Sequence, residues 1–271
     1  MVVQHNMQAM NANRQLGVTT DSQKKVTEKL SSGYKVNRAA DDAAGLTISE
    51  KMRSQIRGLT QASANAQDGV SVVQTAEGAL TEVHSMLQRM NELAVKAANG
   101  TNTTADRTAI QSEISALTSE ISRVAESTEF NTLSLLKGTF KKAIQVGAAN
   151  RNEQRISISI AGMSATSLEV KSVDVKTSAG AQNAIASITK AIAKVSKQRS
   201  DLGAIQNRLE HTIANLDNVV ENTTAAESQI RDTDMAKTMV EYTKNNILSQ
   251  AGTAMLAQAN QSTQNVLSLL G

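Results

Sequence analysis

The sequence predicts a mainly α protein: long antiparallel helices packed as a coiled-coil rod with one small β-hairpin, and terminal helices that form an inner coiled-coil core on assembly. Three observations support this prediction. Apolar residues recur with heptad spacing over long stretches, and the pattern changes to strict alternation in one central segment. Aromatic residues, which supply much of the area of a thick core, are limited to two Tyr and two Phe in 271 residues. A thin rod therefore fits better than a globule.

Three heptad stripes predict the rod helices. The first ends at Asn99-Gly100, a common helix stop, and consists of Val73, Ala76, Leu80, Val83, Leu87, Met90, Ala94 and Ala97. The second consists of Ile110, Ile114, Leu117, Ile121 and Val124. The third spans roughly 50 Å and follows positions 185, 188, 192, 195, 199, 202, 206, 209, 213, 216 and 220.

Between the second and third stripes, residues 144–146 and 156–160 alternate apolar and polar side chains, which predicts two half-buried strands. The polar segment 147–154 between them predicts the turn of a β-hairpin. Irregular chain is expected from there to Val175.

The two ends, residues 2–33 and 235–270, are predicted amphipathic helices whose apolar faces have no partner in a compact monomer. Because isolated helices are marginal in water, we expect these ends to be disordered until they are buried against each other or against copies of the chain. The expected self-assembly residues are Val3, Met7, Met10, Leu16, Leu248, Met255, Leu256, Val266, Leu267, Leu269 and Leu270.

The predicted organisation has five segments. An N-terminal inner-core helix and connector occupies 1–42, and rod helices occupy 43–139. The hairpin and irregular segment occupies 140–179, the returning rod helix 180–231, and the C-terminal inner-core helix 232–271.

Several functions are excluded by what the sequence lacks. The absence of Cys rules out disulfides, thiolate metal sites and a Cys nucleophile. The three His residues lie far apart, and no Gly-rich phosphate loop occurs, so we expect no enzyme, cofactor or metal. A net charge of +3 with few aromatics argues against nucleic acid. No signal peptide and no membrane-spanning stretch is visible. The acid pair Asp41-Asp42 is expected to cap a helix or contact Arg38.

Several motifs, in the right order, closely resemble bacterial flagellin. They are Leu30-Ser31-Ser32-Gly33, Asn37 to Leu46, Met52 to Leu59, Gln74 to Leu80, Leu87 to Val95, Ile247 to Asn260, and Gln264 to Leu270. Only 140–179 separates the two matching halves, which resembles a minimal form without variable outer domains. The chain departs from the family where Ser262-Thr263 replaces a common Val-Pro and Gly271 replaces an Arg.

The resemblance implies a structural subunit that polymerises into the flagellar filament for motility, and a secreted, extracellular location reached by flagellar type III export. Its implied partners are copies of itself, an export chaperone on the C-terminal helix, and hook-associated and cap proteins at the filament ends. Two alternatives remain: a hook–filament junction protein, which builds only a short ring, and a coiled-coil adaptor or receptor-binding effector, which stays a discrete oligomer.

The resemblance also implies binding by the innate immune receptor Toll-like receptor 5. Its expected contacts are Gln88, Arg89, Glu92 and Leu93, with Glu113 on the next helix. Arg89 and Leu93 are four apart and share a helix face, and the stripe leaves that face pointing away from the rod seam. Asn91 stands where many relatives have a second Arg. The alternative is an ordinary solvated face.

Overall fold

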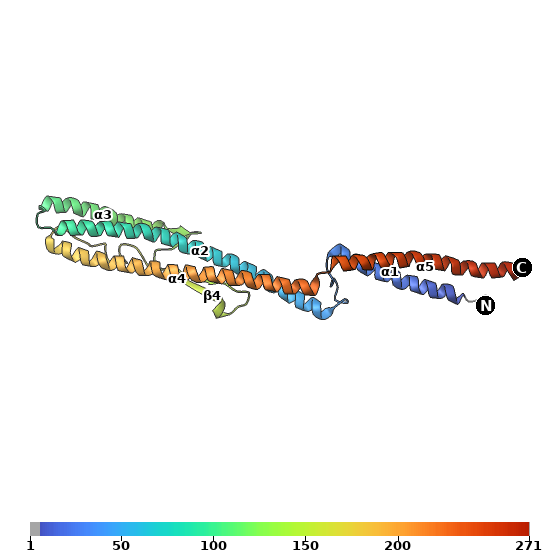
Figure 1. The fold of residues 1–271 in the computed structure, drawn as a ribbon. Coiled ribbons are helices and arrows are strands. Elements are labelled where there is room, and N and C mark those ends of the chain that lie inside the picture. Colours follow the sequence, from blue (N-terminus) through green and yellow to red (C-terminus); the bar gives the residue numbers. More distant parts are fainter. Residues whose placement is uncertain (1–5, 271) are drawn as a thin grey trace. The chain divides into compact units, whose positions relative to one another are not determined.

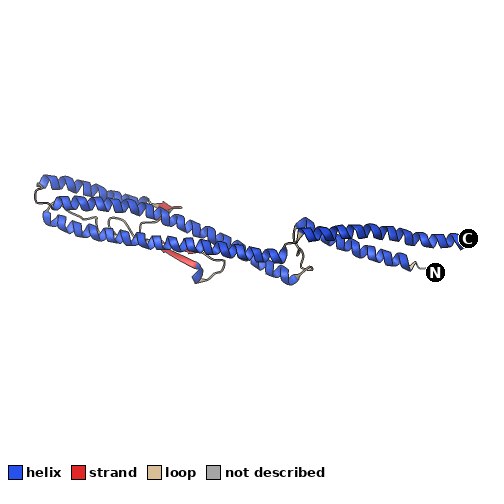
Figure 2. Cartoon of the chain, in the orientation of Figure 1, coloured by secondary structure: helices blue, strands red, loops and turns tan. Residues whose placement is uncertain are grey.

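The structure is a computed structural model that describes residues 6–270, with side chains described up to Ser262. Helices form most of the chain, and the strands are short (Figures 1 and 2). The helices are α1 Met7–Ser32, α2 Ala43–Ala98, α3 Thr104–Ser127, α4 Ser178–Arg231 and α5 Met235–Leu270. The strands are β1 Glu129–Phe130, β2 Leu133–Ser134, β3 Lys141–Gln145 and β4 Arg155–Ser159, with a 3-10 turn at Asn152–Gln154.

The chain forms two compact units, and both boundaries fall inside long helices. The rod unit is Arg57–Val220, and the terminal unit combines Met1–Ile56 with Glu221–Gly271. The first turns of α2 and the last turns of α4 therefore belong to the terminal unit, although their sequence continues the rod helices.

The predicted heptad stripes are the core of the rod unit. All eight residues of the first stripe on α2 are fully buried. On α4 burial recurs every seventh residue, at Ala181, Ile188, Val195, Leu202, Leu209 and Leu216. In the rod unit α2 lies between α3 and α4 (Figure 1), and the stripes meet in one hydrophobic cluster as far as Ile213 of α4. Leu216 and Val220 pack in a second, smaller cluster with Leu59 and Ala62. The prediction of a helical rod is confirmed.

Helix α3 begins with a capping box. The Thr103 hydroxyl accepts from the Asp106 N–H, and the Asp106 carboxylate accepts from the Thr103 N–H. The end of α2 is closed by the Arg107 guanidinium, which donates to the carbonyl oxygens of Ala97 and Asn99 at 2.9 and 3.1 Å. These bonds satisfy groups that helix ends leave unpaired and fix the turn between the two helices.

The predicted β-hairpin is confirmed. Strands β3 and β4 pair antiparallel, with Ile144 opposite Ile156. A second, two-residue hairpin joins β1 to β2 and was not predicted. Asn131 and Thr132 at its turn have φ of 48° and 64°, as a type I′ turn requires, and the Asn was the one available signal.

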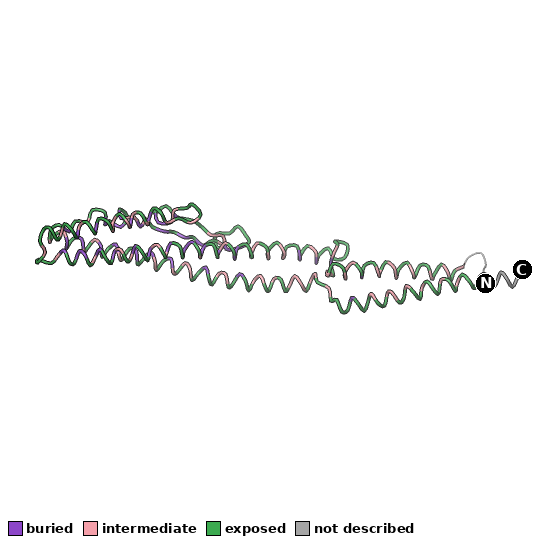
Figure 3. The backbone as a smooth tube through the Cα atoms, turned by 90° about the horizontal axis from the view of Figure 1, so that it is seen from above, coloured by how far each residue is buried: buried purple, intermediate pink, exposed green. Residues whose placement is uncertain are grey.

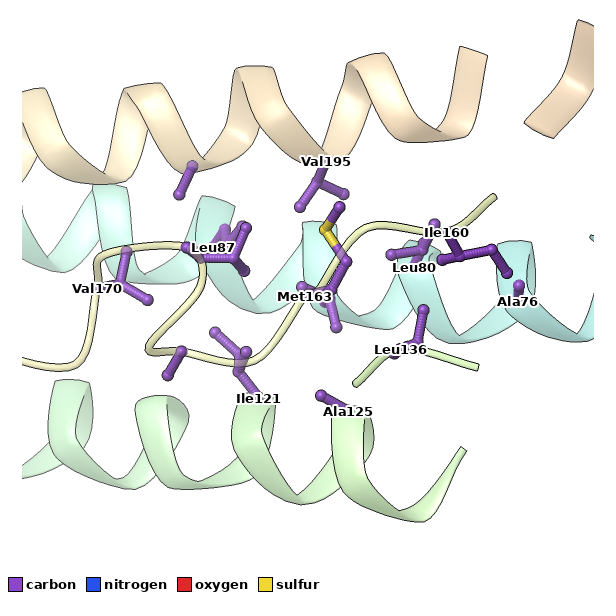
Figure 4. Close-up of a cluster of buried hydrophobic side chains, with 14 of the residues drawn as sticks. Ala76, Leu80, Leu87, Ile121, Ala125, Leu136, Ile160, Met163, Val170 and Val195 are labelled. Atoms are coloured by element: carbon purple, nitrogen blue, oxygen red, sulfur yellow. The ribbon is translucent and has the colours of Figure 1, made fainter. Parts of the chain in front are cut away.

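The segment that was expected to be irregular is irregular, but it is part of the core. Ile160, Met163 and Val170 project between α3 and α4 (Figure 4). Two buried or half-buried glutamines hold this segment. The amide of Gln198 on α4 bonds the Ala161 N–H and the Ser159 carbonyl at 3.2 and 3.3 Å. The amide of Gln111 on α3 bonds the Val175 N–H and the Val173 carbonyl at 2.7 and 3.0 Å.

Candidate functional site

The terminal helices α1 and α5 pack along each other, through a seam in which small and polar residues outnumber large apolar ones. A subset of the buried and partly shielded positions follows heptad spacing on both helices. On α1 this subset is Ala9, Ala12, Leu16, Thr19, Gln23, Val26 and Leu30, and on α5 it is Tyr242, Asn245, Ser249, Gly252, Leu256 and Ala259. A Cβ on Gly252 would lie 3.2 Å from Leu16 Cδ1, so this glycine allows a close approach.

The larger apolar side chains of the same two helices face solvent. Met7 is 69% exposed, Ile247 61% and Met255 63%. The whole exposed set on these helices is Met7, Met10, Val18, Met235, Met239, Val240, Ile247, Leu248 and Met255. Figure 3 shows the contrast with the rod unit, where the buried positions are concentrated. An apolar surface of this extent marks an interaction site. We call these nine residues the assembly face.

The structure separates the expected self-assembly residues into two groups. Met7, Met10, Leu248 and Met255 belong to the assembly face. Leu16 and Leu256 lie in the seam between α1 and α5. Val3 lies outside the described residues, as do the side chains of Val266, Leu267, Leu269 and Leu270. Five assembly-face residues were not among the expected ones: Val18, Met235, Met239, Val240 and Ile247.

Charge is scarce in the first part of α1 and the last part of α5. No Asp, Glu, Lys or Arg follows Lys244 in the sequence, and Arg14 is the only one before Asp21. Removing an unpaired charge from water costs far more than removing an amide or hydroxyl. These two stretches, 7–20 and 245–270, are rich in Asn, Gln, Ser and Thr and carry one charged residue, so they are suited to burial against other helices.

The connections of the terminal helices to the long helices meet in a bonded joint. Arg231 forms an ion pair with Glu50 at 3.1 Å, and its guanidinium carbon lies 4.5 Å from the centroid of the Tyr34 ring. The backbone adds bonds from the Lys35 N–H to the Arg231 carbonyl and from the Thr233 N–H to the carbonyl of Gly33, which has a φ of +76°. Only the tertiary contacts reveal this joint.

The acid pair beside the joint has a structural role, as predicted. Asp41 accepts from the backbone N–H of Arg38 at 3.0 Å, and that hydrogen bond holds the pKa of the Asp41 carboxyl below its ordinary value. Asp42 accepts from the Gly45 N–H at 2.9 Å at the start of α2. Both carboxylates are therefore engaged in capping the backbone.

Of the predicted receptor contacts, three meet in one ion-pair cluster. Arg89 lies 2.9 Å from Glu113 and 3.2 Å from Glu92, and all three side chains are largely exposed. The Glu113 carboxylate, more than Glu92, raises the pKa of Arg89. Gln88 is exposed as well, and its amide lies 3.1 Å from His84 Nε2.

The prediction that Leu93 points away from the rod is wrong. Leu93 is only 3% exposed and belongs to the hydrophobic core. The prediction assumed a two-helix seam, but α2 contacts both α3 and α4, and packing against two neighbours buries a wider face of the helix than one stripe. Leu93 lines the same shallow groove as Arg89, Glu92 and Glu113, although little of its side chain is exposed.

No group of three or more His, Cys, Asp or Glu residues that could hold a metal ion occurs within the described part of the chain. Between residues 6 and 270, no helix is long and apolar enough to cross a lipid bilayer.

Comparison with known proteins identifies the family. Residues 3–141 match the bacterial flagellin N-terminal helical region, and residues 185–270 match the C-terminal helical region. A flagellin of Halalkalibacterium halodurans is 54% identical over 271 residues, covering 100% of both chains. A flagellar filament 31.3 kDa core protein of Treponema maltophilum is 50% identical over 287 residues, again covering 100% of both. A flagellin of Bacillus subtilis is 50% identical over 303 residues with the same coverage.

Solved structures agree with the fold. A flagellin of Bacillus cereus has a TM-score of 0.50 at 30% identity and covers 56% of this chain and 88% of its own. A flagellar hook-associated protein of Vibrio parahaemolyticus has a TM-score of 0.59 but 13% identity, over 71% of this chain and 100% of its own, and shows a shared fold only. The fold and the exposed helix pair define a helical structural protein. The chain belongs to the bacterial flagellin family.

Proposed function

We propose that this flagellin-family chain is a secreted subunit of the bacterial flagellar filament, which polymerises through α1 and α5 and serves motility. The assembly face supports this most directly, because it leaves nine large apolar side chains exposed on a helix pair whose outer parts, 7–20 and 245–270, carry only one charged residue. A contact between different surfaces that does not close into a ring propagates as a helical polymer. The rod unit, in contrast, buries most of its large apolar side chains within one chain.

Negative-stain electron microscopy of the purified chain, after seeding or salting out, tests the proposal. We expect long filaments from the full chain and none from a chain lacking residues 1–42 and 232–271. A single-residue test is Leu248→Asp, which places a charge in the assembly face and should prevent polymerisation. The matched control Leu248→Met keeps the site apolar and should polymerise.

Other outcomes favour the alternatives. Short rings from the full chain would indicate a hook–filament junction protein. A discrete oligomer under polymerising conditions would indicate an adaptor. The flagellin matches at both ends of the chain support the filament subunit over either alternative.

The assembly face would also bind the proteins that act before and after polymerisation. The apolar side chains of α5, from Met235 to Met255, are what a flagellar export chaperone would cover before type III export. Hook-associated and cap proteins would contact the terminal helices at the ends of the filament. Co-purification of the chaperone with the full chain, and its loss on removing residues 232–271, tests the first of these partnerships.

A second proposed activity is binding to Toll-like receptor 5. The exposed cluster of Arg89, Glu92 and Glu113 supports it, with Gln88 beside the cluster. Arg is often a binding hot spot, and its truncation typically costs about 2 kcal/mol or more. We therefore expect Arg89→Ala to weaken binding to the receptor ectodomain by roughly thirtyfold.

The matched control is Arg123→Ala, because Arg123 is an exposed arginine of α3 that also pairs with a glutamate, Glu120. Equal affinities for the two variants in surface plasmon resonance would place the receptor elsewhere. Leu93 is unsuitable for this test because it is buried and its truncation would disturb the rod.

A further inference from the structure

Eight of the ten methionines fall into two environments; of the other two, Met1 lies outside the described residues and Met52, near the start of α2, is half-buried. In the rod unit, Met90 and Met163 are buried, and Met86 is partly buried. In the terminal helices five methionines are between 49% and 69% exposed: Met7, Met10, Met235, Met239 and Met255. Every methionine among the exposed large apolar residues of the described chain therefore lies on the assembly face.

Exposure decides which methionines can react. A peroxide transfers one oxygen atom to the thioether sulfur: the sulfur supplies two electrons, the O–O bond breaks, an S–O bond forms, and water leaves. The product is methionine sulfoxide, in which a polar oxygen replaces a sulfur lone pair. The five exposed sulfurs should react first, and the sulfurs of Met90 and Met163 should be shielded.

The exposed methionines also occupy positions where a polar group would be costly. Met239 lines an apolar groove on α5 together with Ile247 and Leu248. Met255 lines a second groove, between α1 and α5, together with Leu16. A sulfoxide oxygen that is buried against such surfaces without a hydrogen-bond donor loses its hydration and gains nothing in return.

We propose that Met7, Met10, Met235, Met239 and Met255 form an oxidation-sensitive site that permits polymerisation when reduced and opposes it when converted to sulfoxides by a peroxide. This inference rests on the proposed assembly function. It makes the free subunit the vulnerable state, since polymerisation buries the assembly face. The change is reversible, because methionine sulfoxide reductases restore the thioether.

The experiment uses the full chain as monomers and as filaments, each treated with hydrogen peroxide, which is then removed with catalase. Peptide mass spectrometry measures the oxidation of each methionine, and seeding followed by sedimentation measures the critical concentration. In monomers we expect the five methionines to oxidise well before Met90 and Met163. The critical concentration should rise about tenfold or more, because the free energy of burying one methionine side chain already corresponds to a factor of about ten. Filaments should show slower oxidation of the five.

Two further measurements separate this effect from general damage. A variant with Met7→Leu, Met10→Leu, Met235→Leu, Met239→Leu and Met255→Leu keeps the face apolar and of similar volume, so peroxide should leave its polymerisation unchanged. Independently of that variant, treatment of the oxidised natural chain with methionine sulfoxide reductases should restore polymerisation.

Three results would overturn the inference: normal polymerisation of the oxidised chain, equal loss in the leucine variant, or no recovery after reduction of the sulfoxides. Oxidation of Met90 and Met163 at the same rate as the five would also overturn it, since exposure would then not select the site. Failure of the untreated chain to polymerise would instead overturn the proposed function and, with it, this inference.

Discussion

In the rod unit Leu80, Leu87 and Leu202 are fully buried, whereas in the terminal unit Met7, Ile247 and Met255 are each more than 60% exposed. Across the described chain, buried apolar residues are concentrated in the rod unit and exposed large apolar residues in the terminal unit. Among buried apolar residues only Val26 and Val36 lie in the terminal unit, and among exposed large apolar residues all but Val95 and Leu133 lie there.

The two units nevertheless share one periodicity. Both pack their helices through positions three and four apart, but the rod places mainly aliphatic residues there, whereas small and polar residues outnumber large aliphatic ones in the terminal pair. The rod therefore gains its hydrophobic stabilisation within one chain. The terminal pair retains an apolar surface that only other molecules can cover. Heptad spacing thus identifies which residues share a face, and residue chemistry decides whether that face serves folding or assembly.

The largest expected effect comes from damaging the rod core. Leu80→Ala removes a fully buried side chain and should lower the free energy of unfolding of the rod unit by about 3–5 kcal/mol, because a cavity remains. Urea unfolding followed by circular dichroism measures this. The control Val95→Ala, at a side chain 54% exposed in the same helix, should change stability by about 0.5 kcal/mol or less. Similar losses in both variants would contradict the assignment of the core.

The second largest loss of unfolding free energy should come from removing the hydrogen bonds between Gln198 and the irregular segment. Gln198→Met keeps the volume but leaves the Ala161 N–H and the Ser159 carbonyl without their partner, which should cost about 1–3 kcal/mol. Hydrogen exchange at the Ala161 amide should accelerate as well. Gln206→Met on the same helix serves as the control, since the Gln206 amide bonds the exposed Glu210. Unchanged exchange at Ala161 would show that Gln198 does not hold the segment.

A substitution on the assembly face should separate folding from polymerisation. Ile247→Ala truncates a side chain that is 61% exposed, so the unfolding free energy of the monomer should shift by about 0.5 kcal/mol or less. The critical concentration for polymerisation should rise roughly tenfold, as expected for losing part of a buried aliphatic side chain. Sedimentation after seeding measures it. A monomer destabilised as strongly as by Leu80→Ala would mean that Ile247 belongs to the folded core.

Two glycines inside helices allow one helix of each unit to be stabilised separately. A Cβ at Gly78 in the rod or at Gly17 in the terminal unit would meet no atom within 4 Å. Replacing either by Ala should therefore favour the helix by about 1 kcal/mol. Gly78→Ala should raise the melting temperature of the rod, whereas Gly17→Ala should leave it unchanged and increase only the helix content of the free chain. A change in rod melting caused by Gly17→Ala would show that α1 contributes to the stability of the rod unit.

The smallest expected effect is the dependence of rod stability on acid. Lys194 bonds Glu169 at 2.8 Å and lowers the pKa of that carboxyl. A carboxyl with a depressed pKa in the folded state contributes stability above its unfolded pKa and loses it as the pH falls through its folded pKa. Lys194→Met should remove this contribution at pH 7 and show less change on acidification. Since the pair is exposed, the effect should be small, and thermal melts at pH 7 and pH 3 measure it.

The sequence by itself determined the long helices, the eight-residue stripe on α2, the β3–β4 hairpin and the family. These features depend on the spacing of apolar residues or on local motifs, and both are properties of a single segment. The capping role of Asp41 and Asp42 was predictable for the same reason, because each carboxylate bonds a backbone N–H within four residues.

Only the tertiary structure decided which faces are covered. It buried Leu93, because α2 packs against two helices rather than one, and it buried the irregular segment around Met163 and Val170. It also joined Arg231 to Tyr34 and Glu50, which lie far apart in the chain. On α1 and α5 it placed mostly small and polar residues, with Leu16, Val26, Leu30 and Leu256, in the seam and left nine other large apolar residues exposed. Periodicity defines the faces of a helix, but the number and chemistry of its neighbours determine which of those faces is buried.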